Sequence, residues 1–158
     1  MKQFKTNALR ILDKQKITYA IKEYRCDEEH LSGDHIIEQV DMQPEQIYKT
    51  LVLQDNNKQY LVCCIPVFDE IDLKKLAKVA KAKSVNMIHQ KDLLNITGYI
   101  RGGCSPIGMK KVFPTYFDQQ ILNQKEVAFS AGKRGYQMIV NPIDLINYLN
   151  VVVESVVK

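Results

Sequence analysis

The stretch Tyr48–Val67, YKTLVLQDNNKQYLVCCIPV, decides the fold because it joins two runs of strand-forming residues through a short polar segment. Residues 48–54 and 59–67 are rich in branched and other apolar side chains, which favour strands. The DNNK segment between them, residues 55–58, is a strong turn signal. The sequence therefore predicts a β-hairpin in this part of the chain.

Lys49 is unusual within this hairpin, because period-two alternation places it on the same strand face as Leu51 and Leu53. A charged ammonium group on an apolar face is costly unless it is paired or lies at a cleft. Burial there would lower the pKa of the lysine and make it responsive to the anion or carbonyl of a substrate. The alternative is a strand-end lysine whose side chain extends to water.

Helices and shorter strands are expected on both sides of the hairpin. Capping residues and apolar periodicity predict helices after Thr6, after Ser32 or Asp34, after Asp72, over 90–95 and after Asn141. Short or alternating apolar runs predict strands over 17–24, 85–88, 126–130 and 137–140, while residues 151–157 fit either state. This order predicts a mixed α/β fold with a curved, largely antiparallel or mixed sheet.

The composition is that of an ordinary globular protein. The chain has 158 residues, of which 46% are hydrophobic and 25% charged. These values fit one domain over residues 1–158 and exclude a disordered or coiled-coil protein. The longest apolar runs, such as 61–67, are too short to cross a membrane, and residues 1–16 lack the apolar core of a signal peptide. We therefore expect a cytoplasmic protein with no membrane partner.

The four cysteines and three histidines do not follow zinc-ligand spacing. Cys63 and Cys64 are adjacent in a predicted strand, so their side chains should point to opposite faces. We expect buried, reduced thiols, and neither a metal nor another cofactor.

Basic residues are concentrated in one part of the chain. Residues 73–117 hold nine Lys and Arg and one acid, a net charge of +8, whereas the rest of the chain carries −4. Such a patch indicates a polyanionic partner, RNA or DNA. The alternative is a solvated helix face, because four of the lysines follow helical spacing: Lys74, Lys75, Lys78 and Lys81. No aromatic residue lies among these lysines, so base stacking on them is not predicted.

Six of the seven glycines fall in two short loops, GYIRGGCSPIG over 98–108 and SAGKRG over 130–135. Such loops expose backbone N–H groups that can hold a carbonyl oxygen, a carboxylate or a phosphate. The alternative is that they are tight turns and nothing more. Neither loop is a P-loop, because Met109 stands where that motif requires lysine, and the dinucleotide-binding pattern G-x-G-x-x-G is absent.

The sequence offers no conventional nucleophile with an adjacent base. Cys104 lies in a glycine loop, but no histidine is near it in the sequence. Ser105 precedes a proline and lacks the G-x-S-x-G pattern of a nucleophile elbow.

Four segments, taken in order, carry a family resemblance: KTLV over 49–52, the two glycine loops, and Asp144-Leu145 near the end. This set resembles the YbaK family of bacterial Cys-tRNA(Pro) deacylases, which are related to the editing domain of prolyl-tRNA synthetases. The resemblance implies a compact α/β editing domain over residues 1–158, with a mixed, barrel-like sheet flanked by helices. It further implies hydrolysis, in trans, of cysteine wrongly attached to tRNA(Pro), with prolyl-tRNA synthetase as a partner and no role for DNA.

The same resemblance implies the site residues. Lys49 matches the family's essential lysine and would be catalytic. Substrate-binding roles would fall on Tyr24, Thr50, Gly102, Gly103, Cys104, Ser105, Pro106, Gly132 and Lys133. Three positions depart from the family pattern: Asn7 stands where many members have proline, Ser32 where a pocket aromatic is common, and Ala131 where glycine is frequent.

In family members resembling this chain, the thiol of the substrate's own cysteine attacks the ester carbonyl, so the protein supplies no nucleophile. Lys49 and the backbone N–H groups of residues 102–105 would then stabilise the oxyanion. Three alternatives stay open: a deacylase of the same fold for Ala-tRNA(Pro), a non-catalytic module that binds tRNA or the synthetase, and an unrelated small-molecule binder.

Overall fold

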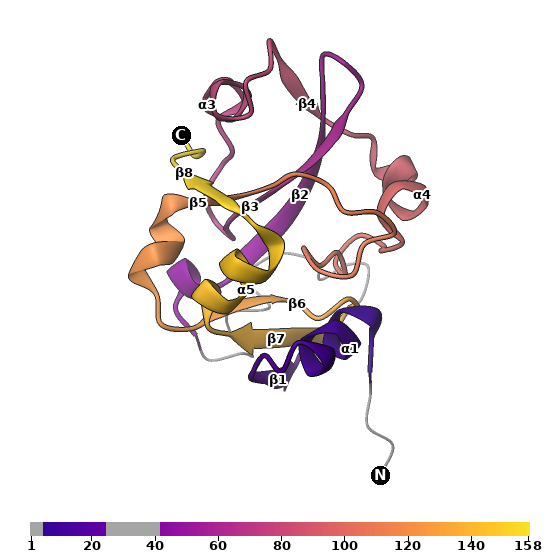
Figure 1. Cartoon of the computed structure of the whole chain (residues 1–158), viewed down its shortest axis with the longest axis vertical. Helices are drawn as coiled ribbons and strands as arrows, with labels where there is room; N and C mark the ends of the chain where they lie inside the picture. The colour runs from indigo at the N-terminus through magenta and orange to yellow at the C-terminus, as the bar shows by residue number, and fades with distance from the viewer. Residues whose placement is uncertain (1–4, 25–41) are drawn as a thin grey trace.

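The structure, a computed structural model, describes residues 5–24 and 42–158 and arranges their strands in two sheets (Figure 1). The smaller sheet is antiparallel, with the order β1 (Tyr19–Glu23), β7 (Tyr136–Val140) and β6 (Val127–Ser130). The larger sheet has the order β4 (Val85–Met87), β2 (Tyr48–Asp55), β3 (Tyr60–Pro66), β5 (Thr115–Asp118) and β8 (Val152–Glu154).

The larger sheet is mixed. β3 and β4 pair antiparallel with β2, whereas β5 pairs in parallel with both β3 and β8. A parallel bridge between Ile47 and Ala128 joins the two sheets where β2 begins. The mixed α/β prediction is therefore confirmed, although the described strands form two sheets and do not close into a barrel.

The predicted hairpin is the centre of the larger sheet. Its register pairs Lys49 with Ile65 and ends at the turn that follows Asp55. The Asp55 carboxylate closes that turn, because its Oδ1 accepts hydrogen bonds from the N–H groups of Asn57 at 2.8 Å and Gln59 at 2.9 Å. An aspartate that satisfies two turn donors explains why the DNNK segment is such a strong signal.

Most of the predicted helices form at the predicted capping residues. Thr6, Asp72 and Asn141 each accept a hydrogen bond from the first turn of the helix that follows. The helices are α1 (Asn7–Lys14), α3 (Leu73–Val79), α4 (Leu93–Thr97) and α5 (Pro142–Leu149), with short 3-10 segments η1 (Pro44–Gln46), η2 (Gln90–Asp92) and η3 (Gln119–Asn123). No helix in the described ranges is long and apolar enough to cross a membrane. The helix predicted after Ser32 or Asp34 lies outside the described residues.

The sequence patterns missed one strand and left another undecided. β5 is only four residues long and follows Pro114, so neither alternation nor length revealed it. The tail that fitted either state contains a strand, β8, held at the sheet edge by β5. β1 forms as predicted, but Ile21 is 37% exposed because β1 is an edge strand.

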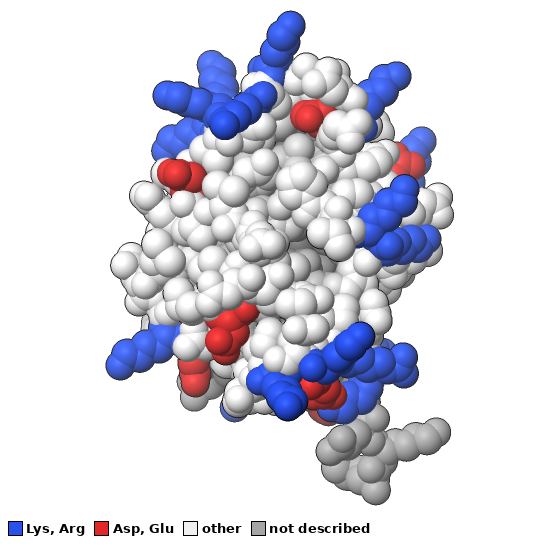
Figure 2. Space-filling model, viewed as in Figure 1, with Lys and Arg blue, Asp and Glu red and all other residues white. Residues whose placement is uncertain are grey.

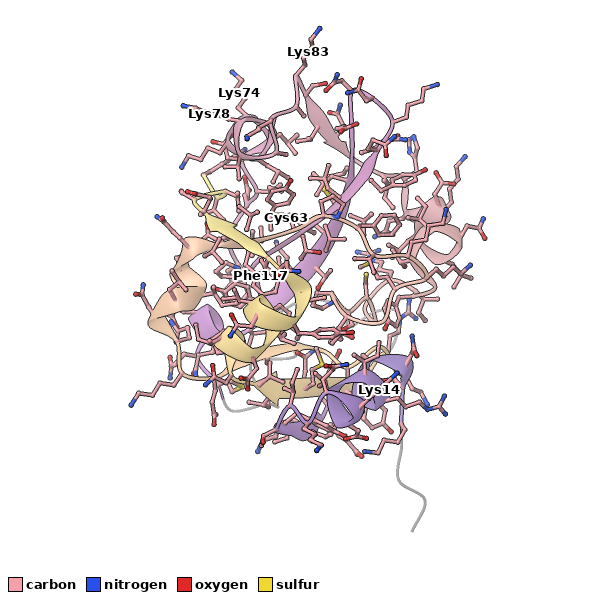
Figure 3. The ribbon with its side chains drawn as sticks, viewed as in Figure 1. Lys14, Cys63, Lys74, Lys78, Lys83 and Phe117 are labelled. Carbon is pink, nitrogen blue, oxygen red and sulfur yellow. The ribbon has the colours of Figure 1, made fainter. Side chains whose placement is uncertain are left out.

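The core divides along the larger sheet. On one face, Cys64 packs with Phe117, Phe129 and Leu9, and on the other, Cys63 packs with a different cluster. Figure 3 labels Cys63 and Phe117 well inside the molecule. The prediction that the two adjacent thiols point to opposite faces and are buried and unpaired is confirmed.

Asp118 is a buried carboxylate that anchors the C-terminal tail. It is 1% exposed, and its Oδ1 accepts a hydrogen bond from the Val156 N–H at 3.0 Å. Its Oδ2 accepts from the N–H and the side-chain amide of Gln120 at 3.1 and 2.8 Å. A buried carboxylate is tolerated here because three donors replace its water.

Replacing Asp118 by alanine should therefore strand buried donors and lower the free energy of unfolding by about 3 kcal/mol. The matched control is Asp144→Ala, which removes an exposed carboxylate in the first turn of α5 and should change stability by less than about 0.5 kcal/mol. Chemical denaturation followed by circular dichroism measures both. Equal effects of the two substitutions would contradict the anchoring role.

Candidate active site

A cavity of about 390 Å³ lies between β2, the start of α4 and both glycine loops. Its walls include Lys49 and Thr50 of β2, Arg101, Gly102 and Cys104 of the first glycine loop, and Ser130 and Gln137 of the smaller sheet. This volume suits a small organic group and is within the range of ordinary ligand pockets. The structure thus places Lys49 beside residues from both glycine segments.

The two glycine loops touch each other directly. A Cβ atom on Gly103 would lie 3.2 Å from the backbone nitrogen of Arg134 and 3.3 Å from the backbone of Lys133. The Arg134 Nε donates a hydrogen bond of 2.6 Å to the carbonyl oxygen of Arg101. A side chain at 103 would therefore force the two backbones slightly apart, which favours glycine at this position.

The beginning of α1 holds both loops from the other side. The Thr6 hydroxyl, which also caps α1, donates to the carbonyl oxygen of Ala131. The Asn7 side-chain amide donates to the carbonyl oxygen of Gly108 at 2.8 Å. Asn7 therefore has a use that the proline common at this position cannot supply, because proline has no side-chain donor.

Tyr99 fills the space between the loops. Its hydroxyl donates to the carbonyl oxygen of Ile107 at 2.6 Å, and its ring lies 3.0 Å from where a Cβ on Gly132 would stand. Gly108 has a φ of +82°, and a Cβ there would be 2.6 Å from the Tyr99 hydroxyl. Both the backbone conformation and the lack of space require glycine at 108.

Lys49 is half-buried where it enters the cavity wall. Desolvation lowers its pKa below the ordinary lysine value, and the nearby carboxylates of Asp69 and Glu70 oppose that shift. An ammonium group with little water around it interacts more strongly with a substrate anion or a polarised carbonyl. Half-burial also fits the alternative, a lysine whose stem is buried while its ammonium group extends to water.

Cys104 lines the cavity but is not an activated thiol. Burial raises its pKa to about 12, and the hydrogen bond with Thr97 offsets this only in part. A thiol with so high a pKa stays protonated at neutral pH, and the protonated form is a poor nucleophile. The structure therefore gives Cys104 a place on the wall without giving it nucleophilic character.

The other predicted site residues lie next to the cavity and not on its described wall. Tyr24 packs in an apolar cluster with Ile47, which does line the cavity, and its N–H donates to the carbonyl oxygen of Gly135. Gly103, Ser105 and Pro106 are buried residues of the first loop, while Gly132 and Lys133 belong to the second loop, which contacts it. These positions fit supporting roles, and their contact with substrate stays a prediction.

Sequence reasoning missed Gln137 and Ser130. Gln137 is 3% exposed, and its Oε1 has no hydrogen-bond partner among residues 5–24 and 42–158. The Ser130 hydroxyl oxygen accepts from the N–H of Gly132 at 3.2 Å. No signal marked Gln137, because one polar residue opening a short strand carries no motif. Among the described residues, no group of three His, Cys, Asp or Glu side chains could hold a metal ion.

Comparison with known proteins gives the class to which this fold and site belong. Residues 34–148 match the family model of the aminoacyl-tRNA editing domain, which covers the hairpin, the cavity and both glycine loops. The chain belongs to this family.

Individual relatives agree with this assignment. The chain is 45% identical over 148 residues to an Enterococcus faecalis protein named "Putative Cys-tRNA(Pro)/Cys-tRNA(Cys) deacylase EbsC", covering 94% of this chain and 90% of that protein. The crystal structure of hypothetical protein APE2540 matches 97% of this chain and all of that one, with a TM-score of 0.88 and 18% identity. A structure described as "a putative trans-editing enzyme for prolyl tRNA synthetase" matches 99% of both chains, with a TM-score of 0.82 and 18% identity.

Alkylation should reveal the protonated state of Cys104. At pH 9, a thiol whose pKa is about 12 is thiolate in only roughly one molecule in a thousand, whereas an ordinary cysteine is about half ionised. We expect iodoacetamide to leave Cys104 unmodified between pH 7 and 9 and its reaction to rise only toward pH 12. Peptide mass spectrometry of the folded protein measures this, and protein unfolded in guanidinium is the control. Modification of folded Cys104 at the rate seen in the unfolded chain would refute the shift.

Proposed function

We propose that this protein is a deacylase that hydrolyses the ester joining cysteine to tRNA(Pro), acting in trans. The proposal is supported by membership of the editing-domain family and by the name of the 45% identical relative. The observation that carries it is the shared cavity, whose lining includes both Lys49 and residues of the first glycine loop. An ester carbonyl needs a cation and N–H donors around its developing oxyanion, and this cavity offers both.

The structure narrows which backbone donors can serve. The Gly103 N–H already donates to the carbonyl oxygen of Ile100 at 2.9 Å, so it is not available to substrate. The N–H groups of Gly102 and Cys104 have no acceptor among the described residues, and both residues line the cavity. We assign the oxyanion to these two donors together with the Lys49 ammonium.

The nucleophile in this proposal comes from the substrate. The cysteine thiol of the aminoacyl group loses its proton, and its sulfur forms a bond to the ester carbonyl carbon. The bond from that carbon to the ribose oxygen then breaks, and the ribose oxygen takes a proton. Water opens the resulting thiolactone and gives free cysteine. The protonated state of Cys104 supports this route, because the thiol of the cavity wall cannot compete as an attacking group.

Gln137, which also lines the cavity, provides a possible hydrogen-bond acceptor for the substrate. A buried amide oxygen without a partner is costly, so a ligand donor that reaches it is favoured. The α-amino group of the aminoacyl ester is a donor next to the reacting carbonyl. We assign Gln137 Oε1 as the acceptor that orients this amino group.

Partner, compartment and domain organisation follow from the same proposal. Because the cavity recognises the aminoacyl end, choice among tRNAs would come from prolyl-tRNA synthetase bound alongside. The reaction would take place in the cytoplasm, where aminoacyl-tRNAs are used. Residues 1–158 would act as one editing domain, which is supported by structural relatives that match 97% or more of the chain.

Single-turnover deacylation tests the proposal. The substrates are Cys-, Ala- and Pro-tRNA(Pro) together with Cys-tRNA(Cys), each with and without prolyl-tRNA synthetase. We expect fast loss of cysteine and little loss of alanine or proline. Loss of alanine at a comparable rate would refute the substrate-thiol step and favour the Ala-tRNA(Pro) alternative. No turnover on any substrate would favour a non-catalytic binding module.

Lys49→Ala should lower the single-turnover rate constant by about 10²–10³-fold, as expected for loss of one oxyanion-stabilising group. The protein should stay folded, because a half-buried lysine at a cavity wall contributes little to the core. Lys58→Ala, in the exposed hairpin turn, is the matched control and should retain the wild-type rate. A Lys49→Ala variant with unchanged turnover would remove Lys49 from the mechanism.

Gln137→Met should separate function from stability. The near-isosteric methionine removes the orphaned acceptor, so the free energy of unfolding should stay the same or rise by up to about 1 kcal/mol. The kcat/KM for Cys-tRNA(Pro) should nevertheless fall about tenfold, because one hydrogen bond to the substrate amino group is lost. Steady-state kinetics and thermal denaturation measure the two effects. A loss of stability that accompanies the loss of activity would indicate a structural role instead.

A further inference from the structure

The basic segment recognised in the sequence is divided by the fold into two surfaces. One surface, the α3 cluster, is formed by the exposed residues Lys74, Lys78, Lys81 and Lys83. Figure 3 shows three of them, Lys74, Lys78 and Lys83, pointing outward at the end of the molecule that carries α3 and β4. None of the four lines the described cavity.

The second surface, the α4 ridge, borders the cavity itself. It consists of Lys91, Arg101, Lys110 and Lys111, all of them exposed. Lys91 lies between Gln90 and Leu93, which line the cavity, and Arg101 lines it as well.

Lys110 and Lys111 join this surface because their segment runs along α4. The Lys110 N–H donates to the carbonyl oxygen of Thr97 at 3.0 Å, and its Nζ lies 3.4 Å from the carbonyl oxygen of Asn95. Figure 2 shows Lys and Arg side chains gathered beside α4, apart from those over α3.

The charges of the α4 ridge are not neutralised within the described part of the chain. None of its four cations forms an ion pair with a described carboxylate. Between the cations stand large apolar side chains that face solvent: Leu94 and Ile100 are about half exposed and Val112 is 94% exposed. Uncompensated cations attract phosphates, and exposed aliphatic side chains can bury apolar surface against an unstacked base, so the ridge fits a ligand that presents both groups.

We propose that the α4 ridge binds the phosphates of the unpaired 3′-terminal nucleotides of the tRNA whose ester enters the cavity. This inference rests on the proposed deacylase function. A ligand held by its terminal ribose in the cavity must leave past exposed residues of its lining, which are Met87, Gln90, Arg101 and Gly102. Arg101 belongs to the α4 ridge and Gln90 adjoins its Lys91, whereas no residue of the α3 cluster lines the cavity.

The exposed apolar residues of the α4 ridge indicate whether this surface binds single-stranded or double-stranded RNA. An RNA double helix offers phosphates and hydroxyl groups on its accessible surface, while its base faces are stacked inside. Only an unpaired end can lay bases against side chains such as Ile100 and Val112. The α4 ridge therefore matches the single-stranded end of a tRNA better than its stem.

Two triple variants of equal charge test this assignment. One is Lys91→Gln/Lys110→Gln/Lys111→Gln on the α4 ridge, and the other is Lys74→Gln/Lys78→Gln/Lys83→Gln on the α3 cluster. Each removes three positive charges and takes the net charge from +4 to +1, so overall attraction to RNA is matched. The probes are two RNA hairpins that carry no amino acid. One ends in the unpaired 3′ nucleotides of a tRNA, and the other is the same hairpin cut to a blunt end. Fluorescence anisotropy gives Kd as a function of salt.

We expect the α4-ridge variant to bind the hairpin with the unpaired end about tenfold or more weakly than wild type. Its plot of log K against log salt should lose a slope of about 2, since each single-strand phosphate contributes about 0.7. The α3-cluster variant should change Kd by less than about threefold. Wild type should bind the blunt hairpin more weakly, and the α4-ridge variant should no longer distinguish the two RNAs.

Two results would overturn the proposal: an equal loss of affinity in both triple variants, or equal binding of the blunt and overhanging hairpins by wild type. Because Lys110 packs along α4, the triple variant could lose affinity by misfolding. The double variant Lys91→Gln/Lys111→Gln leaves Lys110 in place and should lose affinity in proportion to the two charges removed.

RNA that carries no amino acid keeps this binding test separate from catalysis. Selective loss of 3′-end binding in a protein that deacylates nothing would uphold the α4 ridge and refute the deacylase. Deacylation by the wild type together with unaltered RNA binding by the α4-ridge variant would uphold the deacylase and refute the α4 ridge.

Discussion

The close approach of two backbones at Gly103 is the constraint on which the site depends. The first glycine loop lies against Lys133 and Arg134, so the two loops support each other at this point. The start of α1 reinforces this pair through hydrogen bonds from Thr6 and Asn7 to one loop each. The first glycine loop, which lines the cavity, is therefore held by two segments that are far apart from it in the sequence. Contacts of this kind favour a preorganised wall, which the proposed stabilisation of an oxyanion requires.

Lys49 reaches this wall from a different kind of element. It belongs to β2, an interior strand of the larger sheet that pairs with β3 at Lys49 itself and with β4 only at Leu53, Gln54 and Asp55. A side chain on a rigid central strand is positioned more accurately than one on a loop. In the proposed mechanism, the larger sheet would position the Lys49 charge, and the first glycine loop would supply the N–H donors. The bridge between Ile47 and Ala128 joins the two sheets, and it therefore helps to fix the two sides of the cavity relative to each other.

The hairpin, three helix caps and the two glycine loops could all be predicted from the sequence, because each rests on local chemistry. Period two also anticipated the place of Lys49, because it puts this lysine on one strand face with Leu51 and Leu53. Its catalytic role was implied only by the family resemblance and stays a prediction. β5 was not foreseeable, because its four residues are held by partners on both sides and carry no pattern of their own. Gln137 was equally hidden, because its buried, unpartnered oxygen is a property of tertiary packing. Likewise, only the fold separates the basic segment into the α3 cluster and the α4 ridge.

The burial of Cys104 has a consequence for the redox chemistry of the cavity. A protein that releases free cysteine next to its own thiol is exposed to mixed disulfide formation with its product. Thiol–disulfide exchange proceeds through the thiolate, so a thiol with a pKa of about 12 reacts slowly in either direction. In the proposed deacylation, the packing that keeps Cys104 protonated would therefore slow blockage of the cavity by oxidised cysteine.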